Sequence, residues 1–255
     1  MGYPEGIQII EKISGKVTVV NDAKAQKSIL KLNISTFFQQ YKHGLLLLYL
    51  LIYFPWFGWL EKNVTKHFHI IHMTVDDAIP FVEYFIIPYF LWFAYVAAAV
   101  IYFLFKNKNE YFRLCSFLFI GMTVFLIIST VYPNGHYLRP VSFPRDNIFT
   151  DLVRCLYRTD TPTNLFPSIH VYNSIGVNIA IWHSEEFKKN KGIRYGSAVL
   201  MVSIILSTMF LKQHSVFDVI TGIVFSAFMY TLVYSKGVLR IGASKPSLEN
   251  RIRRV

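Results

Sequence analysis

The chain has 255 residues, of which 53% are hydrophobic and 17% aromatic, while only 16% are charged. Because soluble proteins contain about 25% charged residues, this composition excludes an ordinary soluble domain and indicates a membrane protein. The formal net charge of +11 does not indicate a nucleic-acid partner, since no basic stripe is interleaved with aromatic residues on a soluble domain.

The first 43 residues are polar and basic, and they contain no evident cleavable signal peptide. Residues 17–32 fit either an amphipathic helix on the membrane surface or a solvated tail. We expect a cytoplasmic basic segment at residues 1–43, a catalytic membrane domain at 44–236 and a basic cytoplasmic tail at 237–255. The two cysteines, Cys115 and Cys155, are expected near opposite membrane faces, so no disulfide is predicted.

Six apolar segments are predicted to be transmembrane helices, at residues 44–60, 85–105, 114–132, 168–182, 198–211 and 216–234. A span needs about 20 residues, so the short segments must borrow flanking residues or lie partly inside a bundle. The fourth segment is the weakest, because it contains His170 and two asparagines.

Lysine and arginine are more numerous in connections 106–113 and 185–194 and in the two terminal segments than in the remaining connections. The positive-inside rule therefore places both termini in the cytoplasm. The sequence predicts an all-α fold, an integral membrane bundle of six transmembrane helices, with three connections on the non-cytoplasmic side of what we expect to be the cell membrane.

The first outer connection, residues 61–84, contains His67, His69 and His72. Its mixture of apolar and polar residues predicts an amphipathic cap over the bundle. Three histidines can bind a metal, but their spacing fits neither a helix-face pair nor a known zinc pattern. We therefore expect no metal site and interpret these histidines, and His136, as structural.

The second outer connection, residues 133–167, is long for a loop between spans, which indicates a functional role. It contains Arg139, Arg154 and Arg158, and it leads into Ser168 and His170 at the start of the fourth span. The third outer connection is short. It contains Lys212 and leads into His214 and Asp218.

These polar residues are all predicted to meet at one membrane face. His214 and Asp218 lie one helical turn apart, so the carboxylate can fix the imidazole tautomer and raise its basicity. Guanidinium groups and helix N-termini bind phosphate, and Arg139 and Ser168 supply one of each. Two histidines can divide nucleophilic attack and proton donation between them, with no metal or cofactor.

The same fragments resemble the type 2 phosphatidic acid phosphatase superfamily of membrane lipid phosphatases. That family has three blocks: Lys-six residues-Arg-Pro, Pro-Ser-Gly-His, and Ser-Arg-five residues-His-three residues-Asp. The matching positions are Arg139-Pro140, Pro167-Ser168-Ile169-His170, and Ser207 with His214 and Asp218. The resemblance implies that His214 is the nucleophile, Asp218 orients it, His170 is the general acid and base, and Arg139 and Ser168 hold the phosphoryl oxygens.

Three positions depart from the family pattern: Tyr132 replaces the first-block lysine, Ile169 the second-block glycine and Thr208 the third-block arginine. Arg154, Arg158 and Lys212 are the candidates to replace the two missing phosphate-binding cations. The altered second and third blocks resemble the related inositol phosphorylceramide and sphingomyelin synthases, which move a phosphoryl headgroup between lipids.

Two activities and one non-enzymatic role follow. The first is hydrolysis of a lipid phosphate, such as phosphatidic acid or a prenyl diphosphate, on the non-cytoplasmic face. The second is transfer of a phosphorylated headgroup to a lipid alcohol. The third is a membrane carrier without catalysis, which is disfavoured because the charged groups gather at one face. The oligomeric state is not predicted.

Overall fold

The computed structural model describes residue 36 and residues 39–235, and the chain divides into two units, Met1–Gly44 and Leu45–Val255. Every residue of the predicted site belongs to the second unit. The basic tail expected at 237–255, the alternative amphipathic helix at 17–32 and most of the segment 1–43 lie outside the described residues.

The described residues are mainly helical, which confirms the helical part of the predicted fold class. The helices are α2 (Leu50–Asn63), α3 (Thr74–Ala78), α4 (Ile86–Lys106), α5 (Lys108–Val131), α6 (Ile148–Thr159), α7 (Ile169–His183), α8 (Lys191–Phe210) and α9 (Val216–Tyr230). Short turns of helix are η1 (Lys42–Tyr49), η2 (Glu83–Phe85) and η3 (Thr231–Ser235), and two short strands, β1 (His69–Ile70) and β2 (Asn134–Gly135), pair in parallel.

Five helical stretches in the described part are long and apolar enough to cross a membrane: Lys42–Asn63, Glu83–Lys106, Lys108–Val131, Lys191–Phe210 and Val216–Ser235. They correspond to five of the six predicted spans. The predicted fourth span is α7, which has 15 residues and a length of about 22 Å, less than the hydrocarbon thickness of about 30 Å. A sixth span and the orientation of the termini therefore stay predictions.

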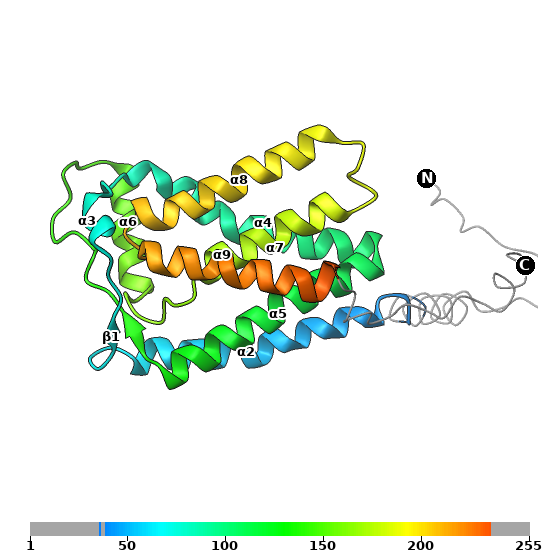
Figure 1. Ribbon diagram of the computed structural model, residues 1–255, viewed down its shortest axis with the longest axis horizontal. Helices are drawn as coiled ribbons and strands as arrows, with labels where there is room; N and C mark the ends of the chain where they lie inside the picture. Colours follow the sequence, from blue (N-terminus) through cyan, green and yellow to red (C-terminus); the bar gives the residue numbers. More distant parts are fainter. Residues whose placement is uncertain (1–35, 37–38, 236–255) are drawn as a thin grey trace, which may run out of the picture. The chain divides into compact units, whose positions relative to one another are not determined.

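Helix α7 is surrounded by protein, because it contacts α4, α5, α8 and α9 (Figure 1). This position explains how an apolar bundle accommodates Asn173 and Ser174, which are almost completely buried. Glycine permits the close packing: a Cβ at Gly121 of α5 would lie 1.9 Å from the ring of Tyr172. The Tyr172 hydroxyl donates to the carbonyl of Phe117 at 2.7 Å, which ties α7 to α5.

The outer connections gather at one end of the helices. Figure 1 shows α3, α6 and β1 at the end where α5 finishes and where α7 and α9 begin. The strand pairing of His69 with Asn134 joins the first outer connection to the second. These connections therefore meet, as expected. His170 and His214 lie at the same end, where α7 and α9 begin.

Candidate active site

Two imidazoles from distant parts of the chain face each other. His214 lies between α8 and α9, and His170 lies in the first turn of α7. The Nε2 atom of His214 is 3.4 Å from Nδ1 of His170, and the rings are tilted by 62°. The predicted meeting of these two residues is therefore present in the structure.

A buried carboxylate supports the His214 ring from the other side. Oδ2 of Asp218 is 3.4 Å from Nδ1 of His214 and accepts the backbone N–H of Ser215 at 3.0 Å. An ionised carboxylate only accepts hydrogen bonds, so the proton of a neutral His214 belongs on Nδ1 and the Nε2 lone pair faces His170. The pair can thus present an unprotonated nitrogen.

The His214 side chain is only 5% exposed. Burial, with a smaller contribution from the positive charge of Arg139, lowers the pKa of His214 to about 3. The imidazole is therefore neutral at neutral pH, as a nucleophile must be.

Helix starts hold both histidines in place. Ser168 caps α7, and its backbone N–H donates to the carbonyl of Asp218 at 3.2 Å. Ser215 caps α9 and forms a capping box with Asp218. The two helices approach closely at Gly222, where a Cβ would lie 3.1 Å from the Ser168 carbonyl oxygen.

Aromatic side chains of α4 enclose His170. Its ring centroid lies 4.7 Å from that of Tyr89 and 4.3 Å from that of Trp92. His170 nevertheless keeps more solvent exposure than His214. Because the two facing nitrogens are only 3.4 Å apart, a phosphoryl group fits between them only if the rings separate.

Arg139 connects the second and third outer connections. Its guanidinium donates to the carbonyls of Asp160 at 2.7 Å and Thr161 at 3.2 Å, and to Oε1 of Gln213. It also stacks on the ring of Tyr157 at 4.4 Å. Burial lowers the pKa of Arg139, against the opposing effect of the Asp160 carboxylate. Most of its donors are therefore already used inside the protein.

The other three predicted cations are directed elsewhere. Nζ of Lys212 donates to the carbonyl of Asp76 at 2.7 Å, Arg154 pairs with two exposed aspartates, and Arg158 is exposed. Within the described part of the chain, no hydrogen bond, ion pair or ring contact joins any of them to His170 or His214. The structure thus does not bring these candidates to the paired histidines.

Asp76 is a site residue that the motifs do not reveal. It lies in α3 and is 1% exposed. Its carboxylate accepts the Ser215 hydroxyl at 2.6 Å, the N–H of Val216 at 2.8 Å and the N–H of Met73 at 2.8 Å. The first outer connection thereby holds the start of α9, next to His214, with a negative charge where a helix N-terminus favours one.

Two further polar residues fix the loop that precedes His170. Oδ1 of Asn134 accepts the N–H groups of Leu165 and Phe166 at 2.8 and 2.9 Å. The Glu61 carboxylate accepts the N–H and hydroxyl of Thr161. His136, interpreted from the sequence as structural, is buried and binds the backbone carbonyl of Gln213 through Nε2 at 2.9 Å.

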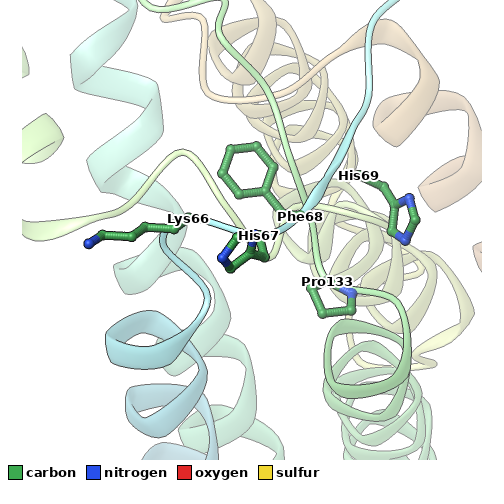
Figure 2. Close-up of a pocket in the computed structure, with 5 residues that line it drawn as sticks. All are labelled: Lys66, His67, Phe68, His69 and Pro133. Atoms are coloured by element: carbon green, nitrogen blue, oxygen red, sulfur yellow. The ribbon is translucent and has the colours of Figure 1, made fainter.

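The histidines of the first outer connection have separate partners. His69 stacks on Tyr132, which replaces the family's first-block lysine, with centroids 4.1 Å apart, and His72 pairs with Asp77 at 2.9 Å. An open pocket of about 380 Å³ lies beside strand β1 and is lined by Lys66, His67, Phe68, His69 and Pro133. Figure 2 shows Lys66 and His69 directed to opposite sides of the chain.

A metal at these histidines gains no geometric support. No group of three or more His, Cys, Asp or Glu residues in the described ranges is arranged to hold a metal ion. Cys115 and Cys155 are unbridged, as predicted.

The family model of the PAP2 superfamily matches residues 144–240, whereas searches of curated proteins and of solved structures find no match. The matched segment includes Ser168, His170, His214 and Asp218 and begins after Arg139. The match confirms the resemblance drawn from the motifs and supports phosphatase or phosphotransferase activity in general. Together with five membrane-length helices, it also supports an integral membrane protein. Residues 144–240 of the chain, which hold the second and third motif blocks, are thus similar to the PAP2 superfamily.

Proposed function

We propose that the protein is a membrane lipid-phosphate phosphohydrolase that acts through a phosphohistidine on His214. The observation that carries the proposal is the 3.4 Å approach of His214 Nε2 to His170 Nδ1, with a buried carboxylate behind the first ring. One neutral, supported imidazole beside a second imidazole is the arrangement that nucleophilic attack and proton transfer require.

In the first step, the Nε2 lone pair of His214 attacks phosphorus and the bond from phosphorus to the lipid oxygen breaks. Protonated His170 gives its proton to that leaving oxygen. The Asp218 carboxylate stabilises the positive charge that develops on the His214 ring.

In the second step, His170 accepts a proton from a water molecule as the water oxygen attacks the phosphohistidine. The bond from phosphorus to Nε2 breaks, which releases inorganic phosphate and restores His214. No step requires a metal ion.

The position of the site favours a substrate that is anchored in the membrane. His170 and His214 lie where α7 and α9 begin, at one end of the helices (Figure 1). A phosphate headgroup can reach this end while its hydrocarbon tail stays among the helices, which suits phosphatidic acid or a prenyl diphosphate. We further propose that α7 is the sixth span and that the site faces the non-cytoplasmic side, as the charge distribution predicts.

Headgroup transfer is the second candidate function. The two family cations are replaced by Tyr132 and Thr208, Tyr132 is stacked on His69, and the ammonium of Lys212 binds a backbone carbonyl. This departure resembles the motif of the phosphotransferase branch, which supports the second candidate. In that case a lipid alcohol takes the place of water in the second step, and His170 removes its proton.

The two candidates are separated by an acceptor test on purified protein in detergent micelles. Labelled phosphatidic acid, a prenyl diphosphate and a phospholipid are each supplied with and without ceramide or diacylglycerol. Release of phosphate without acceptor supports the phosphohydrolase, whereas product that forms only with acceptor overturns it in favour of transfer. Absence of both products from every donor contradicts both enzymes.

A further inference from the structure

Gln213 precedes the proposed nucleophile, at a position that the family's third block leaves unspecified. Its side chain is almost completely enclosed, at 1% exposure. Its amide nitrogen Nε2 has no hydrogen-bond partner among the described residues. Leaving a buried N–H unpaired is costly, so nearly all such groups bind protein, water or a ligand. An unpaired buried donor beside His214 is therefore a candidate ligand contact.

Arg139 fixes which end of the amide is free. An arginine side chain has donors and no acceptor, so the group facing its Nη2 must be the amide oxygen of Gln213. The nitrogen is then turned away from the guanidinium. Arg139 also has its own Nε buried without a partner in the described part of the chain, so both residues retain an N–H for an anion.

The backbone holds Gln213 rigidly. The end of α8 closes with N–H bonds from Lys212 to Met209 and from Gln213 to Thr208, each at 2.9 Å, with Lys212 in the left-handed conformation at φ 53°. This pattern is a Schellman motif. The N–H of His214 donates to the same Thr208 carbonyl at 3.0 Å. One carbonyl group therefore fixes the backbone of both Gln213 and the proposed nucleophile.

The buried ring of His136 adds a third attachment. The N–H of Leu138 donates to Nδ1 of His136 at 3.2 Å, so the ring proton lies on Nε2, which donates to the Gln213 carbonyl at 2.9 Å. Gln213 is thus held through its side-chain oxygen, its backbone N–H and its backbone carbonyl. The side-chain nitrogen is the one strong donor of this residue without a partner in the described ranges.

We propose that Gln213 is a catalytic residue whose Nε2 donates a hydrogen bond to a non-bridging phosphoryl oxygen. The amide takes the part of the family's third-block arginine, whose position is occupied here by Thr208. Arg139 orients the amide through its oxygen and offers its Nε to the same anion. The inference rests on the proposed function, because it requires a phosphoryl group at His214.

The test uses full-length protein in detergent micelles, with phosphatidic acid as substrate and orthovanadate as a mimic of the five-coordinate phosphorus. Gln213→Met removes the donor at similar size. We expect kcat/KM to fall about 100-fold, as when one oxyanion-hole donor is lost, and the vanadate inhibition constant to rise by a comparable factor. Asn178→Leu is the control, because it removes an amide whose oxygen already has a partner inside the protein, the Ser197 hydroxyl. This variant should show wild-type turnover and wild-type inhibition by vanadate.

Gln213→Glu separates donation from a structural role. Glutamate keeps an oxygen toward Arg139, so thermal stability should equal or exceed that of wild type while turnover is lost. Wild-type turnover and vanadate inhibition in Gln213→Met would overturn the inference while leaving the proposed function intact. Turnover that persists in His214→Ala would instead overturn the proposed function itself.

Discussion

Replacing Asp76 with asparagine tests whether the first outer connection positions the nucleophile. The buried carboxylate accepts three hydrogen bonds, two of them on Oδ2, from Ser215 Oγ and Met73 N, and one on Oδ1, from Val216 N. An asparagine amide offers one oxygen and one NH₂ group. In either orientation, at least one partly buried N–H, of Met73 or of Val216, loses its acceptor and faces the new NH₂ group.

The magnitude follows from these contacts. A hydrogen bond to a charged group is worth about 1.5–3 kcal/mol, and an unpaired buried donor has a cost of about the same size. We therefore expect Asp76→Asn to lower the free energy of unfolding by about 3 kcal/mol and Tm by about 6 °C or more. Because Ser215 and Val216 follow His214 directly, kcat should fall on the order of 10- to 100-fold through misplacement of the ring.

Asp77→Asn is the matched control, since Asp77 is the adjacent residue and its side chain is 66% exposed in a pair with His72. Exposed ion pairs contribute little, so this variant should unfold and turn over like wild type. Thermal unfolding in detergent and phosphatidic acid turnover are measured for both variants. Equal Tm and equal kcat for Asp76→Asn and Asp77→Asn would refute the positioning role.

Three further predictions follow from single sites. Gly121→Ala places a methyl group into the Tyr172 ring and should destabilise by about 1–3 kcal/mol, whereas Gly196→Ala, with open space at its Cβ, should be neutral or slightly stabilising in thermal unfolding. Lys212→Gly suits the left-handed backbone and should keep more activity than Lys212→Ala. Burial lowers the pKa of His136 to about 4, so the free energy of unfolding should fall as pH drops from 6.5 toward 4, by about 2 kcal/mol at pH 5. His136→Gln should remove this dependence of Tm on pH.

Each of these predictions has a contrary outcome. Equal Tm values for the two glycine variants would show that α5 and α7 are not packed as described. Equal loss of activity in both Lys212 variants would favour a direct phosphate contact by its ammonium. An unchanged pH dependence in His136→Gln would mean that this ring is not the buried neutral group that the contacts indicate.

The apolar runs and the motif spacing predict most of the helical framework and the central histidine pair. Hydrophobic segments long enough to span can be recognised locally, and the residues at their ends must then meet at one face. Helix α7 shows the limit of this reasoning. Its asparagines weaken the apolar signal because other helices, rather than lipid, surround it.

The supporting residues could not be predicted because their contacts leave no local pattern. Asp76 binds Ser215 across 139 positions, and Glu61 binds Thr161 across 100, each by a single side chain in the first or last turn of a helix. Lys212 is a related case. A lysine beside a proposed nucleophile suggests a phosphate ligand, whereas its left-handed backbone at a helix end is the conformation usually marked by glycine.

In the proposed mechanism, His214 carries the phosphoryl group while His170 moves the proton. The most direct measurement is to react the full-length protein with ³²P-labelled phosphatidic acid, quench the reaction rapidly and map the label to a residue. We expect acid-labile, alkali-stable label on His214, which is absent in His214→Ala and reaches the same site slowly in His170→Ala. Label on another residue, or undiminished labelling in His214→Ala, would contradict this mechanism.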